Sequence, residues 1–284
     1  MADVLTAPPN RPAAPPASPR REPVRPTALG LRALAVGYVG LLVLLPIGVL
    51  VYQALKPGLS FFGDTLTDPD TVHAYEVTAI VAGIALVIDV VFGVAAAVLL
   101  VRYRFPGRRL LSAFIDIPIA VSPIIVGLAL ILVFGPDGWF GSFVQDRVIN
   151  AQPGMILATV FVSLPIVARA IVPVLEQAGV EQEQAAASLG ANALQRFVRV
   201  TLPTIRVALV YGAVLAFARC LGEYGAVLVV SGRIEGETET VPLRIGDLFD
   251  SDLNTEGAYA LTLVLMVVSI AAIVVGAIIR RKRL

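Results

Sequence analysis

Long apolar runs separated by short polar segments dominate the chain. A helix that crosses the ~30 Å hydrocarbon core of a bilayer needs about 20 predominantly apolar residues. Six runs satisfy this length, so the pattern predicts six transmembrane helices at residues 33–55, 77–101, 110–134, 155–175, 207–230 and 258–279. Prolines inside several runs predict kinked helices in a packed bundle, because neighbouring helices can satisfy the carbonyl groups that a proline frees.

Composition supports an all-α integral membrane protein. The 284 residues are 57% hydrophobic and 15% charged, whereas soluble domains carry roughly 25% charged residues. The single Cys220 excludes an internal disulfide, and with one histidine, His73, the sequence offers no metal constellation. The two lysines, Lys56 and Lys282, do not follow a G-x-x-x-x-G loop, so we expect no nucleotide site or other cofactor on this chain. A net charge of +1 gives no indication of a nucleic-acid partner.

The distribution of arginine and lysine predicts the orientation of the helices. Cytoplasmic loops carry an excess of these residues. Placing both termini inside leaves Lys56, Arg147, Arg233 and Arg244 outside, and puts most other basic residues in the cytoplasm: Arg11, Arg20, Arg21, Arg25, Arg32, Arg102, Arg104, Arg108, Arg109, Arg196, Arg199, Arg206, Arg280, Arg281, Lys282 and Arg283. The expected topology is therefore N-in and C-in.

The N-terminal segment differs from the rest of the chain. Residues 1–28 contain eight prolines and almost no large apolar side chains, so they cannot bury enough surface to fold. We expect a disordered cytoplasmic tail there, followed by one six-span domain over residues 29–284. The first apolar run is too long for the apolar region of a signal peptide, which favours an uncleaved first span.

A polar loop at residues 176–206 separates the fourth and fifth predicted spans. Glu181 and Glu183 stand where negative charge suits the start of a short helix, and Gly190 is placed to end it. Asn192 and Gln195 resemble a capping box for a second short helix. An apolar stripe follows at helical spacing, and Leu202-Pro203 is expected to end the element; the stripe comprises Leu194, Phe197, Val198 and Thr201.

Two interpretations of this loop remain open on the pattern alone. One is an amphipathic helix lying on the inner leaflet. The other is a docking element for a soluble protein. The small face of residues 185–187 beside Gly190 favours docking, because small side chains allow another backbone to approach closely.

The loop resembles the segment by which ABC importer permeases bind their ATPase. That pattern is E-A-A, three residues, G, nine residues, I, one residue, and L-P. The matching positions here are Gln184, Ala185, Ala186, Gly190, Val200, Leu202 and Pro203, with Ala191 directly after the glycine. Gln184 replaces the family's glutamate, and Glu183 precedes it. This change either weakens one polar contact to the ATPase or lets Glu183 make it from the adjacent position.

A second resemblance narrows the substrate. Residues 217–226, FARCLGEYGA, resemble a stretch of oxyanion permeases, and further stretches near residues 105–108, 115–123, 154–159, 172–176 and 231–238 resemble the W-type subunit of the sulfate/thiosulfate branch. The resemblance implies a six-helix type I ABC importer permease in a bacterial inner membrane. It also implies a homologous T-type permease, a cytoplasmic ATPase dimer and a periplasmic sulfate-binding protein as partners.

In such a system ATP-driven closure of the ATPases would move the permease by alternating access. A molybdate or tungstate permease is the nearest alternative. A less favoured one is an ion-coupled secondary transporter with Asp89 as carrier, and that class should show an inverted repeat, which we do not find. The sequence carries neither G-x-S-x-G nor H-E-x-x-H, so an intramembrane enzyme is not supported.

Ionisable residues within spans are functional candidates by default. Arg219 and Glu223 lie four residues apart, which predicts one helical face. They form either a self-neutralising packing pair or part of the translocation path. Because Glu223 would cancel much of the potential of Arg219, we expect a gate hinge beside Gly222 and Gly225 rather than a tight anion site.

Three further positions interrupt the apolar spans. Asp116 is expected to pair with a nearby arginine in a structural role. Asp89 could face either Arg169 or the partner subunit. Ser122-Pro123 breaks the third span, where the freed backbone groups could line a polar path or form a plain kink.

Overall fold

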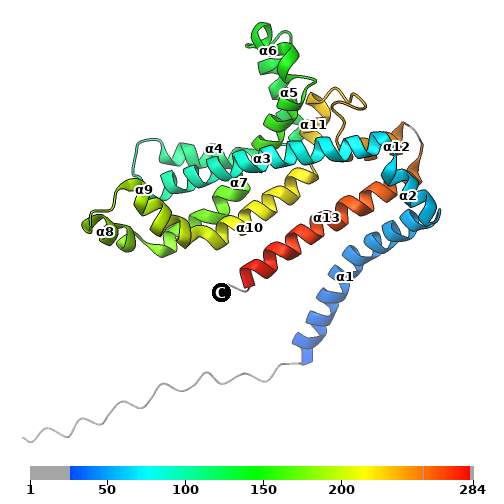
Figure 1. Cartoon of the computed structure of the whole chain (residues 1–284). Coiled ribbons are helices and arrows are strands. Elements are labelled where there is room, and N and C mark those ends of the chain that lie inside the picture. The colour runs from blue at the N-terminus through cyan, green and yellow to red at the C-terminus, as the bar shows by residue number, and fades with distance from the viewer. Residues whose placement is uncertain (1–25, 252, 282–284) are drawn as a thin grey trace, which may run out of the picture. The chain divides into compact units, whose positions relative to one another are not determined.

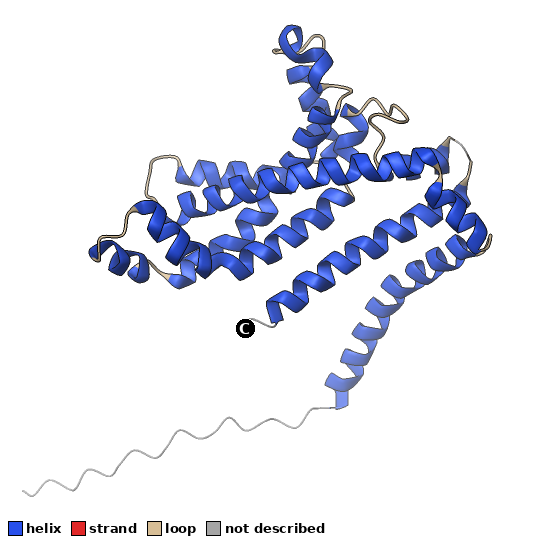
Figure 2. Ribbon diagram, viewed as in Figure 1, coloured by secondary structure: helices blue, strands red, loops and turns tan. Residues whose placement is uncertain are grey.

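The computed structural model describes residues 26–251 and 253–281, and within them every regular element is a helix (Figure 2). The tail predicted at residues 1–28 lies outside the described residues, except that its last three residues begin the first helix. The chain divides into two units at Val49, and each is described by itself. The first unit ends within α1 (Pro26–Leu55), whose apolar stretch Ala33–Leu55 coincides with the first predicted span.

Four long helices form the body of the second unit: α3 (Pro69–Arg102), α7 (Gln152–Ala178), α10 (Leu202–Leu221) and α13 (Thr255–Arg281). Helix α7 packs against both α3 and α10, and α13 packs along α10 (Figure 1). These helices confirm the predicted spans at 77–101, 155–175 and 258–279, and the first part of the one at 207–230. Within the described residues, five helices are long and apolar enough to cross a membrane, and a bent pair provides a sixth candidate.

The third predicted span is not one helix, because it consists of α4 (Arg108–Ala120) and α5 (Pro123–Phe134), which meet at 114°. Val121 and Ser122 are extended, with ψ angles of 136° and 135°. The ring of Pro123 disfavours helical geometry in the residue before it, so the chain turns there instead of kinking. Ser122-Pro123 therefore interrupts the predicted span with a bend of 114° between two separate helices.

The fifth predicted span is also broken. Helix α10 ends at Leu221, and α11 (Gly225–Val230) starts after the short break at residues 222–224. Two of the four residues from 222 to 225 are glycines, which cost about 1 kcal/mol each in a helix relative to alanine. Interrupting the helix at these residues therefore costs little free energy. Helix α11 packs against α5 rather than continuing α10.

The prediction that Leu202-Pro203 ends the preceding element is wrong. Helix α9 (Ala193–Arg196) runs through the π-helical turn η1 (Phe197–Thr201) directly into α10, and Ala193–Leu221 acts as one 29-residue helix. The N–H of Leu202 donates to the carbonyl of Phe197, five residues earlier. This wider turn changes the hydrogen-bond register just before Pro203. The helix therefore continues although Pro203 has no backbone N–H to donate.

The structure also contains short helices that the sequence pattern did not predict: α2 (Leu59–Thr67), α6 (Gly141–Val148) and α12 (Val241–Asp250). Helices α2 and α12 lie at one end of the second unit, whereas α8 (Glu181–Ser188) and α9 lie at the other (Figure 1). One buried apolar cluster joins α3, α5, α7, α11 and α12, and another joins α3, α7 and α10. Both ends are therefore anchored to the same packed helices.

Candidate functional site

The polar loop forms two short helices, as predicted, and α8 has no buried residue. Gly190 ends α8 with a φ of +87°, a conformation in which side chains other than glycine are strained. The N–H of Gly190 donates to the carbonyl of Ala187 at 2.9 Å, and that of Ala191 to the carbonyl of Ala186 at 3.0 Å. These two bonds form a Schellman motif, which confirms the prediction that Gly190 ends the first short helix. No atom lies within 4 Å of the position a Cβ would take there.

The start of α9 has the predicted capping box. The N–H of Gln195 donates to Oδ1 of Asn192 at 2.9 Å, and the N–H of Asn192 donates to Oε1 of Gln195 at 3.0 Å. Ala185, Ala187 and Gly190 are exposed, and the side chain of Leu189 is 89% exposed. The loop thus presents a locally fixed, uncovered surface.

Glu183 points into the protein and joins α8 to two long helices. Its carboxylate lies 3.0 Å from Nε of Arg102, the last residue of α3, and accepts a 2.8 Å hydrogen bond from the hydroxyl of Thr201 in η1. Arg102 also donates to the carbonyl of Leu175 in α7 at 3.0 Å. We call Glu183, Arg102 and Thr201 the inner brace.

The inner brace settles where the Glu183 side chain goes, because its oxygens are occupied within the chain while Gln184 remains exposed. In this conformation the Glu183 carboxylate faces Arg102 and Thr201 rather than the exposed surface of α8. Sequence reasoning assigned Thr201 to an apolar stripe and Arg102 to the basic cytoplasmic loops, and no local signal links residues 81 positions apart.

The two helix breaks lie against each other, where α11 packs on α5. A Cβ on Gly225 would lie 3.2 Å from Cβ of Pro123, and a Cβ on Gly127 would lie 2.8 Å from the carbonyl oxygen of Ala226. A Cβ at Gly127 would therefore force the backbone of α11 to shift, and a Cβ at Gly225 would be tight. Ser122 is exposed and its side chain does not cap α5. The structure brings Ser122, Pro123 and Gly225 together from distant parts of the sequence.

Arg219 and Glu223 pair across the second break. Nη1 of Arg219 lies 2.7 Å from Oε2 of Glu223, whose side chain is 2% exposed. The other oxygen of Glu223 accepts the N–H of Ala226 at 2.9 Å and so caps α11. The prediction of one shared helical face is wrong, since α10 ends before Glu223, and Gly222 lies between helix and carboxylate. In this conformation the charge of Arg219 is compensated, which disfavours a tight anion site at this pair.

The other intramembrane carboxylates have separate partners. Asp116 forms an ion pair with Arg169, with 2.7 Å between Oδ1 and Nε, which confirms its expected arginine partner. Asp89 is fully buried and contacts the hydroxyl of Ser163 on α7 rather than Arg169. Sγ of Cys220 lies 3.4 Å from the same hydroxyl. The hydroxyl of Ser163 on α7 therefore contacts Asp89 of α3 and Cys220 of α10 in the bundle interior.

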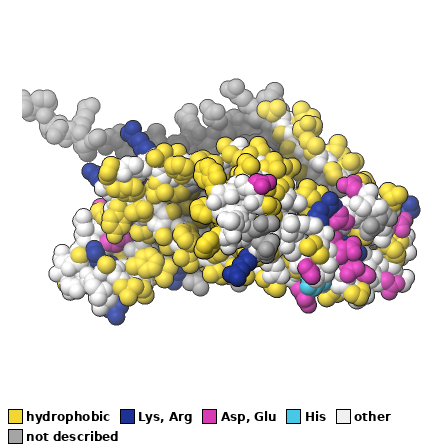
Figure 3. Space-filling view, turned by 90° about the horizontal axis from the view of Figure 1, so that it is seen from above, with side chains coloured by type: hydrophobic (Ala, Val, Ile, Leu, Met, Phe, Trp, Pro, Cys, Tyr) yellow, Lys and Arg dark blue, Asp and Glu magenta, His cyan; other side chains and the backbone are white. Residues whose placement is uncertain are grey.

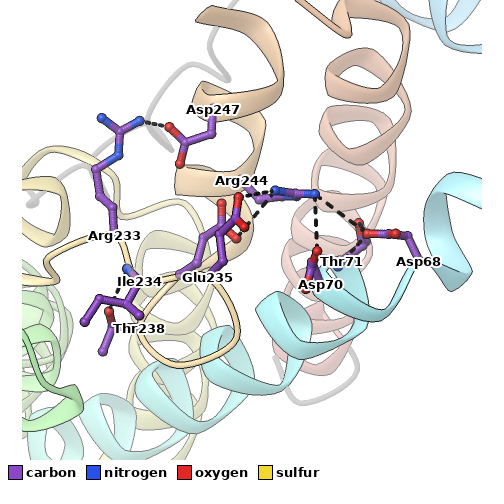
Figure 4. Close-up of polar contacts among 10 residues, drawn as sticks. Asp68, Asp70, Thr71, Arg233, Ile234, Glu235, Thr238, Arg244 and Asp247 are labelled. Carbon is purple, nitrogen blue, oxygen red and sulfur yellow. Dashed lines mark hydrogen bonds and ion pairs between the residues drawn. The ribbon is translucent and has the colours of Figure 1, made fainter. Parts of the chain in front are cut away.

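An arginine surrounded by carboxylates lies at the opposite end of the second unit (Figure 4). Arg244 of α12 lies 3.2 Å from Glu235, 3.8 Å from Asp68 and 3.9 Å from both Asp70 and Glu239. We call these five residues the outer network. It joins α12 and the loop before it to the start of α3.

Acidic side chains predominate around the outer network. In Figure 3 acidic side chains (magenta) gather beside basic ones (dark blue) at the end that carries α2 and α12. Arg233, in the loop before α12, pairs with Asp247. No group of three histidine, cysteine, aspartate or glutamate side chains suited to a metal ion occurs among the residues that the structure describes. Sequence reasoning missed this network because Asp68 and Asp70 lie far in the chain from Glu235, Glu239 and Arg244.

Comparisons with known proteins agree on the class of molecule. The family model "Binding-protein-dependent transport system inner membrane component" matches residues 89–284. The chain is 41% identical over 248 residues to the sulfate transport system permease protein CysW of Synechococcus elongatus, covering 86% of each chain. It is also 41% identical over 211 residues to the CysT permease of Salmonella typhimurium, covering 73% of this chain and 76% of that one.

Among solved structures, the fold is similar to a bacterial alginate ABC transporter in complex with an alginate pentasaccharide-bound periplasmic protein. The TM-score is 0.74 at 16% identity, with coverage of 91% of this chain and 96% of the other. At that identity the similarity concerns the fold, which is that of the type I importer permeases.

Proposed function

The chain belongs to the family of binding-protein-dependent transport system inner membrane components, within its sulfate-permease branch, and from this membership we propose that it is the W-type permease subunit of an ATP-driven sulfate and thiosulfate importer. As a multi-pass permease component it is not an enzyme, and ATP hydrolysis belongs to a separate subunit. The proposed partners are a homologous T-type permease, a dimeric ATPase in the cytoplasm and a periplasmic sulfate-binding protein. The proposed location is the bacterial inner membrane.

One observation carries the proposed coupling to an ATPase: an exposed, small-residue helix is tied to the bundle through a single carboxylate. Helix α8 has no buried residue. Its Glu183 contacts the ends of two long helices through Arg102 and Thr201. A force applied to α8 would therefore reach α3 and α10 directly. The residues proposed to meet the ATPase are Gln184, Ala185, Ala186, Gly190 and Ala191, while Glu183 and the π-turn before Leu202 and Pro203 pass the movement on.

We place the α8 end in the cytoplasm, with both termini inside. Support comes from the arginines that the fold gathers at this end, including Arg102 and Arg196 beside Glu183. The opposite end carries the acidic outer network. This distribution follows the excess of basic residues that cytoplasmic loops show. The proline-rich tail is then cytoplasmic as well.

We propose that the paired breaks form the gate. Helices α5 and α11 meet at glycines, so a small rotation of α10 would separate or close them. ATP binding would bring the two ATPases together, move α8 and open the bundle to the periplasm, and hydrolysis would reset it. Gate residues in this scheme are Ser122, Pro123, Gly222, Gly225 and the Arg219–Glu223 pair. Selection of the oxyanion would fall mainly to the binding protein.

Radiolabelled sulfate uptake in cells that lack this chain tests the proposal. Plasmid-borne wild-type chain should restore uptake, and unlabelled sulfate and thiosulfate should compete. If molybdate or tungstate competes and sulfate does not, the chain serves the related oxyanion instead. Uptake by purified chain in vesicles without ATPase or ATP would contradict the proposal and favour an ion-coupled transporter.

A further inference from the structure

A cavity of about 770 Å³ lies where α3 ends and the chain turns into α4. It is next to the inner brace, since Arg102 is the last residue of α3 and Arg104 lines the cavity. Four arginines contribute to its wall: Arg104, Arg108, Arg109 and Arg169. Neither the proposed coupling nor the proposed gate uses this space.

The cavity carries a surplus of positive charge. Arg169 is engaged by Asp116, and its Nη2 donates to the hydroxyl of Ser112 at 2.9 Å. Among the residues that the structure describes, Arg104, Arg108 and Arg109 have no ion pair within 4.0 Å. Glu176 also lines the wall and offsets one of these charges. The exposed side chains of Arg104, Arg108 and Arg109 therefore leave two positive charges without a counter-charge in the open cavity.

The start of α4 adds to this surplus. Helix N-termini favour acidic residues because the helix dipole is positive there. Here the first turn begins with Arg108 and Arg109 and contains no acid, and Gly107 provides no side-chain cap. This arrangement is electrostatically unfavourable by itself, and an anion placed among the arginines would relieve it.

The remaining wall of the cavity is apolar and indicates what kind of anion fits. Leucine, valine and phenylalanine side chains line it beside the arginines: Leu100, Val101, Phe105, Leu110 and Val172. Apolar side chains would not stabilise a free oxyanion. A phospholipid, in contrast, carries a phosphate next to hydrocarbon and can contact both parts of the wall. Basic pockets between membrane helices on the cytoplasmic side bind anionic headgroups in this way.

We propose that this cavity binds an anionic phospholipid of the cytoplasmic leaflet, with its headgroup phosphate at Arg104, Arg108 and Arg109 and its acyl chain along Phe105 and Val172. Only the placement of this end in the cytoplasm rests on the proposed function. The bound lipid would fix the short loop between α3 and α4 directly beside the inner brace.

Native mass spectrometry of the detergent-purified permease complex tests this site, with phosphatidylglycerol titrated against phosphatidylcholine. An arginine near a membrane surface contributes about fivefold to binding of anionic lipid. The triple variant Arg104→Gln, Arg108→Gln and Arg109→Gln should therefore bind phosphatidylglycerol at least tenfold more weakly. Arg206→Gln is the matched control, because Arg206 is an exposed arginine of α10 near the same end and does not line the cavity. It should leave binding unchanged.

A second variant separates a lipid from a free ion. Phe105→Ala should weaken phosphatidylglycerol binding, and inorganic sulfate at millimolar concentration should not displace the lipid. Displacement by sulfate, with no effect of Phe105→Ala, would replace the lipid by a free oxyanion and overturn the proposal. An equal loss in Arg206→Gln would show a nonspecific basic surface and would overturn it too. If the triple variant does not fold, Arg108→Gln alone is compared with Arg206→Gln; lipid binding is read without transport, so a failed sulfate assay leaves this test intact.

Discussion

The two ends of the second unit hold a charged side chain with opposite kinds of partner: a carboxylate is bound at one end and a guanidinium at the other. At the inner brace, the Glu183 carboxylate is held by Arg102 and by the hydroxyl of Thr201. At the outer network, Arg244 is surrounded by four carboxylates at 3.2 to 3.9 Å. The first is a compact link between three elements, and the second is a diffuse link between a loop, α12 and α3.

The two clusters therefore differ in role. The inner brace connects α8 to the long helices, whereas the outer network stabilises the folded bundle. Removing any member of the inner brace should disconnect α8 from α3 or from η1 and leave the bundle packed. Removing one carboxylate of the outer network leaves others in place, whereas removing Arg244 leaves negative charges facing one another. The inner end should therefore be sensitive in transport, and the outer end sensitive in folding.

The largest effect is expected from Arg244→Met. The Arg244 side chain is 10% exposed and lies within 4.0 Å of four carboxylates, so the substitution removes the cation that these ion pairs share. Breaking a buried ion pair from one side costs about 3 to 5 kcal/mol. Thermal unfolding in detergent should show a strongly lowered midpoint. The exposed Glu235→Gln should change it little, and equal effects of the two variants would refute the asymmetry of the network.

The next effect concerns transport. Glu183→Gln removes the charge that holds Arg102, so ATP hydrolysis should continue while sulfate moved per ATP falls roughly tenfold, within the usual range of coupling energies. The paired exchange Arg102→Glu with Glu183→Arg should restore part of the uptake. Glu181→Gln, on the exposed start of α8, is the control. If Glu183→Gln moves as much sulfate per ATP as the wild-type chain, the inner brace does not take part in coupling.

A bulky residue at Gly190 should block uptake without preventing membrane insertion. Gly190→Leu strains a backbone with φ of +87° by about 1 to 2 kcal/mol and places a side chain into open space at the proposed docking surface. Gly236→Leu matches it, because Gly236 has a φ of +71° and open space in the outer loop. Loss of uptake in both variants would point to backbone strain, and retention in both would remove the docking role.

The smallest effects on uptake are expected at the contact between α5 and α11, where the substitutions act on packing. Gly127→Ala places a Cβ 2.8 Å from the Ala226 carbonyl oxygen, and overpacking of this kind costs about 1 to 3 kcal/mol. Gly225→Ala meets Pro123 at 3.2 Å and should cost less. Uptake rates and unfolding midpoints of both variants measure the ranking. A reversed order would contradict the close approach of these helices.

Local signals in the sequence were sufficient for much of the fold. Apolar length predicts α1, α3, α7 and α13, and cap chemistry predicts the Gly190 Schellman motif and the Asn192 capping box. Apolar length also conceals breaks, so α4–α5 and α10–α11 were each predicted as one span. A π-turn before Pro203 leaves no propensity signal, which is why a helix end was expected there.

The site was predictable only where its residues are close in sequence. The partner of Asp116 was expected as an unspecified arginine, and Asp89 was left between two candidates, because pairing across helices depends on their rotation. The inner brace and the outer network were missed for the same reason. They join residues from separate helices, and a single sequence gives no register between helices.

Accessibility of an engineered cysteine on α8 tests the central claim most directly. Cys220 is 5% exposed, so it should react little with a membrane-impermeant maleimide. The reagent should therefore label mainly the new cysteine of Ser188→Cys, an exposed position on α8. Ser251→Cys, exposed at the other end, is the control. The account predicts that Ser188→Cys is labelled in inside-out vesicles and protected once the ATPase is bound, while Ser251→Cys is labelled from outside. Labelling of Ser188→Cys in intact cells would contradict it.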